Sequence, residues 1–142
     1  MKVKYHFEYV QKILFMRIEP NSQITGYLPN VAGWFHCDVG SQGEENLMAI
    51  KEYLKHPTDE HLLLGSNAYE VHVKKDYTTV SYDYEYANPE MVPCTIPTQM
   101  VCELLQAWTK EYAKYSKEDA KAENANVATK TLGEKIKEIF KK

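Results

Sequence analysis

Residues 69–86, YEVHVKKDYTTVSYDYEY, alternate apolar and polar side chains on both sides of a short charged segment. In residues 69–74 every second side chain is apolar, and the pattern returns in residues 79–86. A period of two is typical of a strand with one buried face. Residues 75–78 separate the two runs, so we predict an antiparallel β-hairpin. Its tyrosine-rich face should meet the core, and its acidic face should meet solvent or a partner.

The first residues of the chain show a similar pattern. Apolar and polar side chains alternate in residues 3–9, and residues 13–18 form a second apolar run. We predict a second hairpin with its turn in residues 10–12, although this segment has neither the Gly nor the Asn that short hairpin turns favour. One face of the strand at residues 3–9 is expected to be buried.

Residues 21–43 are rich in Gly, Pro, Asn and Ser, and we expect only short strands there, at residues 24–28 and 34–39. Ser41 and Glu44 have the spacing of a capping box, in which the two side chains satisfy free backbone N–H groups at a helix start. Apolar residues then recur at helical spacing until Pro57. We therefore predict a helix over residues 44–55.

The second half of the chain contains two further helical patterns. Pro97 suits the first turn of a helix, and an apolar stripe follows through residues 101–112. Weaker helical spacing returns near the end of the chain. The sequence thus predicts a single α+β domain over residues 1–142. Its mainly antiparallel sheet comes from strands near 3 to 18, 69 to 74 and 79 to 86, with helices near 44 to 55, 98 to 115 and 128 to 140 packed on it.

Charge and composition bound the function. The chain has 142 residues and a formal net charge of -3, which argues against nucleic acid as the main ligand because phosphate binding needs a concentrated basic face. No apolar run approaches the roughly 20 residues that span a bilayer, and the N-terminus lacks the pattern of a signal peptide. We therefore expect a cytoplasmic protein that binds neither nucleic acid nor membrane.

The cysteines give no sign of a reactive or metal site. Three cysteines, Cys37, Cys94 and Cys102, cannot all pair within one chain. His36, Cys37 and Asp38 are adjacent, but neighbours in an extended segment point to opposite faces and cannot converge on one ion. We predict a structural role for this group, with Cys37 buried, and core packing for Cys102. No catalytic residue, metal or cofactor is predicted.

The acidic face of the predicted hairpin at residues 69–86 is the sharpest candidate site. Glu70, Asp83 and Glu85 occupy alternate positions on paired strands and could form a cluster of carboxylates. Such a cluster could be an acid/base pair, a divalent-metal site or a surface for a basic partner, or only a solvated sheet face. We predict partner binding by these three residues together with Asp76 and Tyr77.

The segment after residue 61 resembles a known protein family. Residues 67–71, NAYEV, lead to a Tyr-rich acidic strand, and residues 96–98, IPT, lead to LLQAW at residues 104–108. This pattern, across residues 62–115, resembles the small immunity proteins of bacterial contact-dependent growth inhibition and related polymorphic toxin systems. The resemblance implies an antitoxin that binds the C-terminal domain of its cognate toxin, often a nuclease, one to one and without turnover.

An acidic surface suits that role, because nucleases hold phosphate backbones with basic surfaces and opposite charges steer association. Two alternatives remain open at this point. One is an enzyme with a carboxylate site on the same hairpin. The other is a small-ligand binding or accessory domain with an apolar cavity lined by tyrosines.

Overall fold

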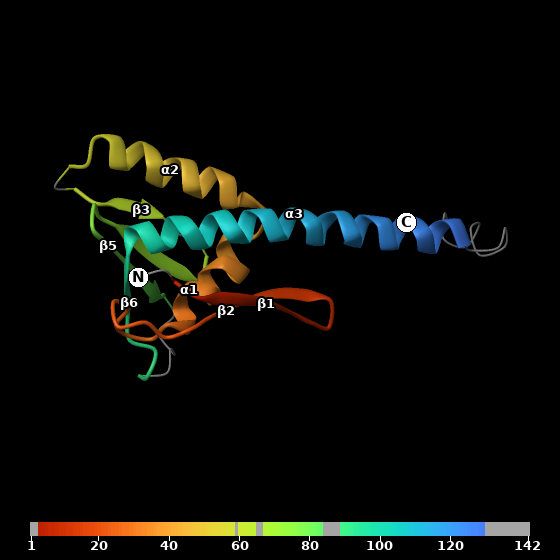
Figure 1. Ribbon diagram of the computed structural model, residues 1–142, viewed down its shortest axis with the longest axis horizontal. Helices are drawn as coiled ribbons and strands as arrows, with labels where there is room; N and C mark the ends of the chain where they lie inside the picture. Colours follow the sequence, from red (N-terminus) through yellow and green to blue (C-terminus); the bar gives the residue numbers. More distant parts are fainter. Residues whose placement is uncertain (1–2, 59, 65–66, 84–88, 130–142) are drawn as a thin grey trace. The chain divides into compact units, whose positions relative to one another are not determined.

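The structure is a computed structural model that describes residues 3–58, 60–64, 67–83 and 89–129 (Figure 1). The chain divides into two compact units, Met1–Tyr112 and Ala113–Lys142. The first unit contains every strand that the structure describes. The described part of the second unit is the continuation of the last helix, α3 (Thr98–Thr129). The α+β class with antiparallel sheets is confirmed, and the assignment of residues 1–142 to one domain stays a prediction.

A four-stranded antiparallel sheet lies at the centre of the first unit. Its order is β3 (Leu62–Leu64), β4 (Tyr69–Val73), β5 (Tyr77–Tyr82) and β6 (Cys94–Pro97). The predicted hairpin is confirmed as β4 and β5, with Val71 opposite Val80. The turn lies at residues 74–76, earlier than predicted, because Tyr77 already pairs with Pro97 of β6. The predicted strand residues after Asp83 lie outside the described residues.

Strand β6 contradicts the expectation that Pro97 belongs to the following helix. Pro97 is the last residue of β6, and α3 begins at Thr98. β6 is the edge strand of its sheet, where a residue without a backbone N–H is tolerated. Thr25 bridges to Thr95 on the outer side of β6, with backbone N···O distances of 2.9 and 2.8 Å. This bridge occupies one edge of the sheet and β3 forms the other, and neither β1 nor β2 pairs with either edge.

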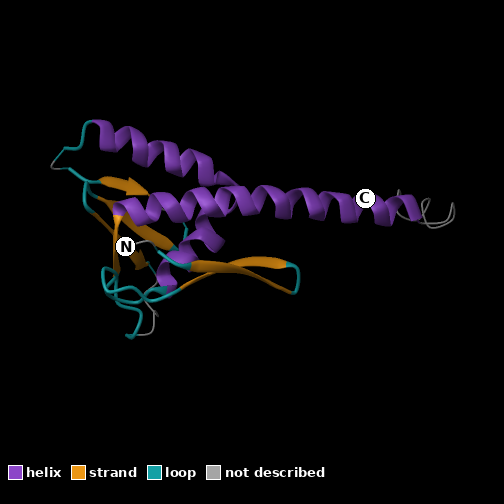
Figure 2. Cartoon of the chain, viewed as in Figure 1, coloured by secondary structure: helices purple, strands orange, loops and turns teal. Residues whose placement is uncertain are grey.

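The N-terminal hairpin is therefore a separate two-stranded sheet of β1 (Tyr5–Val10) and β2 (Ile13–Ile18), which Figure 2 shows apart from the larger sheet. The hairpin itself is confirmed, whereas its predicted place in one common sheet is wrong. Gln11 and Lys12 form the turn with φ of 51° and 66°, the left-handed values that a two-residue turn of this kind requires. Thus the turn forms with two non-glycine residues in a conformation that they rarely adopt.

The expected buried face of the first strand is only half correct. In β2, Leu14 and Met16 are 2% and 1% exposed, and they provide the buried side of the hairpin. In β1, Tyr5 and Tyr9 are 40% and 48% exposed, while Val3, just before the strand, is buried. Burial is thus concentrated on the strand that contacts α1 (Pro29–Trp34) and the π-helical turn η1 (Phe35–Val39).

Residues 24–28 and 34–39 are not the strands that we expected. The second segment lies in α1 and η1, because Val31, Trp34, Phe35 and Val39 follow helical spacing and are all buried. A short 3₁₀ turn, η2 (Gly40–Gln42), leads to α2 (Gly43–Lys55). The predicted helix is confirmed, but its capping box is wrong: Gln42 is the N-cap, and no side chain caps the helix.

The predicted apolar stripe of α3 is confirmed. Val101, Leu104 and Leu105 are fully buried, and Trp108 is 1% exposed. The indole Nε1 of Trp108 donates a hydrogen bond to the Gly40 carbonyl oxygen at 2.8 Å, which joins α3 to η2. The helix continues to Thr129, well beyond the predicted end at residue 115. Most of the helix predicted at residues 128–140 lies outside the described residues. Among those described, no helix is both long and apolar enough to cross a membrane.

The inner face of the four-stranded sheet is the core of the first unit. Alternate residues of β4, β5 and β6 point to this face, and all of them except the half-buried Tyr82 are buried: Tyr69, Val71, Val73, Thr78, Val80, Cys94 and Ile96. Helix α1 closes it at Gly33, where an added Cβ would meet the Tyr69 hydroxyl. Burial raises the pKa of Tyr69 to about 12. The start of α3 closes it at Thr98, whose hydroxyl lies 2.9 Å from that of Thr78.

Candidate functional site

The predicted acidic residues lie on the outer face of the four-stranded sheet and at its ends. Glu70 is half-buried, and its Oε1 lies 3.0 Å from Nε2 of His72 on the same strand. The ring of His72 contacts that of His61, with centroids 4.4 Å apart. Asp83 is exposed just after β5, and its backbone N–H donates to the Ala68 carbonyl. Since Glu70 faces Ser81, the register places Asp83 at a neighbouring position on the same face.

Asp76 and Tyr77 do not belong to this group. Asp76 is the last residue of the turn before β5 and Tyr77 is the first residue of β5, whereas Asp83 follows that strand, so about six residues, or roughly 20 Å, separate Tyr77 from Asp83 along the strand. Tyr77 is 51% exposed. Together with Lys74, Lys75, Tyr53 and Thr58, the two residues line an open cleft of about 330 Å³. Glu85 lies outside the described residues. The five predicted residues therefore do not make one patch.

Among His36, Cys37 and Asp38, the structure shows a structural role for Asp38, whereas the prediction of a buried Cys37 is wrong. They lie in η1, and Cys37 is exposed instead of buried, because the segment is helical and its buried side is formed by Phe35 and Val39. The Asp38 carboxylate accepts hydrogen bonds from the backbone N–H groups of Ala68 and Tyr69, at 3.1 and 2.9 Å. It thereby fixes the start of β4 against η1.

The environments of the three thiols favour the neutral form. Burial raises the pKa of Cys94, which is fully buried in β6, to about 11. Burial also raises the pKa of Cys102 and of Cys37, and the negative charge of Asp38 adds to the effect at Cys37. The thiolate is the nucleophilic form of cysteine, so these environments oppose reactivity. In the part of the chain that the structure describes, no group of three or more His, Cys, Asp and Glu could hold a metal ion.

The β1–β2 hairpin presents an exposed surface that the sequence did not indicate. Eight large apolar side chains are exposed among the described residues, and four of them, Tyr5, Tyr9, Val10 and Ile13, belong to this hairpin. Val10 and Ile13 form the last pair before the turn and are 45% and 42% exposed. We call residues 10–13 the hairpin tip. Figure 1 shows this tip directed away from the four-stranded sheet.

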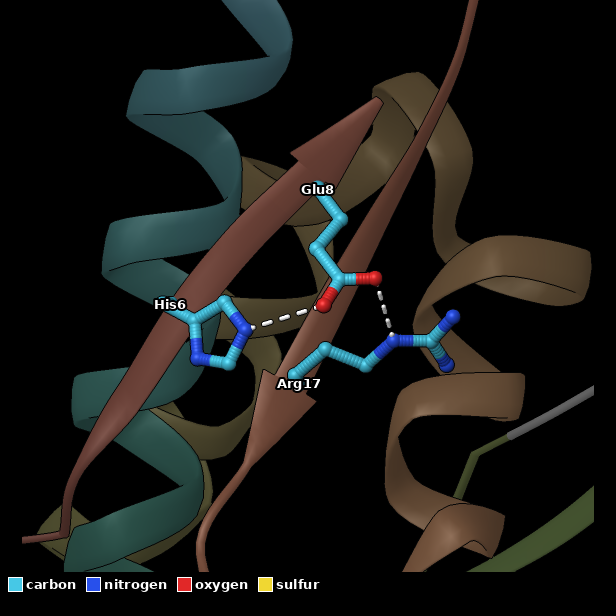
Figure 3. A network of polar contacts seen from close by, with 3 residues as sticks. All are labelled: His6, Glu8 and Arg17. Atoms are coloured by element: carbon cyan, nitrogen blue, oxygen red, sulfur yellow. Dashed lines mark hydrogen bonds and ion pairs between the residues drawn. The ribbon is translucent and has the colours of Figure 1, made fainter. Parts of the chain in front are cut away.

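Polar contacts order the face of the same hairpin on which Val10 and Ile13 also lie (Figure 3). The Glu8 carboxylate accepts a hydrogen bond from Arg17 Nε at 2.9 Å with one oxygen, and its other oxygen lies 3.0 Å from His6 Nε2. These two partners lower the pKa of Glu8, Arg17 first. The guanidinium carbon of Arg17 lies 5.4 Å from the centre of the Phe15 ring, which stacks on His36.

Beside Arg17 lies a cleft between the end of β2 and the start of α1. Its volume is about 250 Å³, and all but one of its lining residues are apolar: Met16, Ile18, Pro20, Leu28, Pro29 and Ala32. The remaining one is Arg17. We call this cleft with Arg17 the β2–α1 cleft.

One signal in the sequence could have revealed the polar face of the hairpin. Once the turn is placed at residues 11 and 12, pairing assigns His6 to Arg17 and Glu8 to Phe15. Opposite charges then fall on neighbouring positions of one face, which is a favourable cross-strand arrangement. The cleft had no such signal, because it depends on how α1 packs beside β2.

Comparisons of this chain with models of protein families, with curated proteins and with solved structures gave no match.

Proposed function

We propose that this protein acts by binding another protein, without turnover, and that the partner is the toxin domain of a bacterial polymorphic toxin system. In this proposal the chain is a cytoplasmic immunity protein that covers the active site or the substrate surface of the toxin in a one-to-one complex.

The observation that carries the proposal is the exposed tip of the β1–β2 hairpin. Val10 and Ile13 are exposed side by side as the last pair before the turn, and the ring of Tyr9, the residue before Val10, is exposed as well. Exposed apolar groups that gather in one place and are bordered by charges are typical of protein interfaces, whereas single exposed apolar residues are ordinary. Here Lys12 lies in the turn, and Glu8 and Arg17 flank the tip.

The fixed geometry of the hairpin also supports a role in binding. The Glu8 to Arg17 ion pair links the two strands, and the Phe15 ring stacks on His36 of η1. A surface that is ordered before binding loses little conformational freedom when the complex forms. The hairpin can therefore present its tip to a partner at a small entropic cost.

The toxin as partner rests on the resemblance across residues 62–115 and on charge. Asp83 is exposed and Glu70 half-buried at neighbouring positions of the outer sheet face, and the net charge of the chain is -3. An acidic protein associates quickly with the basic surface of a nuclease. The predicted contacts through Glu70, Asp83, Glu85, Asp76 and Tyr77 remain part of the proposal, as an electrostatic contribution.

The test is binding and protection with the toxin-like domain encoded beside this chain in its source genome. We expect a one-to-one complex in calorimetry, and growth of a bacterial host that expresses both proteins. Replacing Val10 and Ile13 by Asp should weaken the complex at least about 100-fold, because two apolar contacts are lost and two charges are desolvated. Asp83→Lys should weaken it less and mainly slow association.

A matched control is available on α2. Met48 is 63% exposed and lies outside the hairpin, so Met48→Asp should leave the affinity unchanged. Equal losses for the Met48 variant and the tip variant would remove the hairpin from the interface. Absence of both the complex and the protection would refute the immunity function.

A further inference from the structure

We infer that the β2–α1 cleft receives a large apolar side chain of the partner protein. Arg17 then binds the carboxylate of an Asp or Glu that is next to this apolar residue in the partner. This inference rests on the proposed protein-binding function and specifies a second contact, at the base of the same hairpin whose tip carries that proposal. It predicts that the partner presents an apolar residue beside Asp or Glu.

The cleft has the size and lining for one side chain. Its volume of about 250 Å³ exceeds the roughly 150 Å³ that accommodates a benzene molecule, but is below the range typical of drug-sized ligands. Its floor is the buried Met16, and Ile18, Leu28 and Ala32 form half-buried walls. Pro20 and Pro29 are exposed at the rim, so the cleft is open to solvent and can admit a side chain that stays attached to a protein.

Arg17 supplies the polar part of the recognition. Glu8 bonds the guanidinium through Nε, and the Phe15 ring lies under it, so its position is fixed from two sides. Figure 3 shows both terminal amino groups on the side away from Glu8. Among the described residues neither amino group has a hydrogen-bond partner, so both can donate. A guanidinium offers paired donors that match the two oxygens of a carboxylate.

The lining also distinguishes a carboxylate from a nucleic-acid phosphate. Arg17 is the single charged residue of the cleft, and its neighbours there are apolar. Nucleic-acid sites neutralise several phosphates with a basic face. One cation beside an apolar cleft instead matches one carboxylate beside one apolar group.

The test uses three capped pentapeptides as probes: Gly-Ser-Phe-Asp-Gly, Gly-Ser-Phe-Asn-Gly and Gly-Ser-Ala-Asp-Gly. They are titrated into the ¹⁵N-labelled full chain and followed by NMR. We expect the Phe-Asp peptide to shift the amide signals of Ile18, Leu28 and Ala32, with a dissociation constant in the millimolar range. The Phe-Asn and Ala-Asp peptides should bind at least about five-fold more weakly, because each lacks one of the two contacts.

Variants of the chain identify the contact. Arg17→Gln should reduce binding of the Phe-Asp peptide to that of the Phe-Asn peptide, and Arg17→Lys should give an intermediate value because it keeps the charge without the paired donors. Lys51→Gln removes an exposed cation of α2, outside the hairpin and the cleft, and should have no effect. Unchanged signals elsewhere in the Arg17→Gln spectrum establish that the variant is folded.

Several outcomes would overturn the inference. They are equal binding of the three peptides, shifts outside the cleft, absence of shifts at millimolar peptide, and an effect of Arg17→Gln no larger than that of Lys51→Gln. The inference and the proposed function can fail separately. If the complex with the toxin-like domain forms and Arg17→Gln leaves its affinity unchanged, the function stands and the cleft contact is refuted. If peptide binding follows Arg17 but no toxin complex forms, the cleft stands and the immunity function is refuted.

Discussion

The two hairpins of the first unit have similar sequence patterns but different surroundings. In β4 and β5, Val71, Val73 and Val80 are fully buried, because neighbouring strands flank the pair on both sides and helices cover its inner face. In β1 and β2 no further strand is paired among the described residues, and burial is limited to the side of β2 that meets α1 and η1. Alternation therefore predicts a strand, whereas burial depends on what the strand packs against.

The largest expected effect on the free energy of unfolding comes from a substitution that detaches the β4–β5 hairpin from η1. Asp38→Ala leaves the backbone N–H groups of Ala68 and Tyr69 without their acceptors at buried positions, and should lower the free energy of unfolding by about 3 kcal/mol. Urea denaturation measures this change. The matched carboxylate on the other hairpin is Glu8, which is half-buried but bonds only the exposed side chains of His6 and Arg17, so Glu8→Ala should leave the midpoint nearly unchanged. Equal midpoints for the two variants would show that Asp38 does not anchor the sheet.

A pair of identical substitutions compares the hairpins directly. Val71→Ala removes two methyl groups from a fully buried site and should cost about 2 to 3 kcal/mol in unfolding free energy. Val10→Ala makes the same change at a side chain that is 45% exposed and should cost less than about 0.5 kcal/mol. Both changes in unfolding free energy are calculated from urea midpoints, with the same dependence of free energy on urea concentration for the two variants. A cost at Val10 as large as that at Val71 would mean that the hairpin tip is packed in solution.

The smallest expected effect is a gain at the turn of β1 and β2. Gln11→Asn combined with Lys12→Gly places the two residues favoured by this turn at positions whose φ is positive. The free energy of unfolding should rise by about 1 kcal/mol, because the left-handed backbone conformation is then less strained. The thermal midpoint and the urea midpoint both report the change. The reverse control, Lys12→Val, should destabilise, and a gain from both variants would exclude backbone strain as the cause.

The local periodicity of the sequence was sufficient for both hairpins, for the helix at α2 and for the stripe of α3. Each depends on side chains that repeat at fixed intervals along a few turns or residues. The expectation of strands at residues 24–28 and 34–39 was wrong, because Gly and Pro in that region signal interruptions without specifying the structure between them. Helical spacing of Val31, Trp34, Phe35 and Val39 was present, but Pro29 and Gly33 obscured it.

For the candidate site, the sequence indicated an acidic outer face, and Asp83 is exposed as expected. The sequence could not show that Asp76 and Asp83 lie at opposite ends of β5. Their separation depends on where the strand begins and ends, which the alternation alone does not fix. Nor could the sequence indicate that Glu70 bonds to His72, a contact between alternate residues that depends on side-chain rotamers.

By itself, the sequence determined the two hairpins, the helix α2 and the apolar stripe of α3, since alternation and helical spacing are properties of a few neighbouring residues. The tertiary structure alone decided that the strands form two sheets and that the β1–β2 hairpin leaves its tip exposed. The physical reason is packing between segments that are distant in sequence: α1 and η1 contact one side of β2, and Thr25 pairs with Thr95 at the outer edge of β6. The same packing forms the β2–α1 cleft beside Arg17. The cleft combines residues 16–20 with residues 28–32, on either side of the loop between β2 and α1.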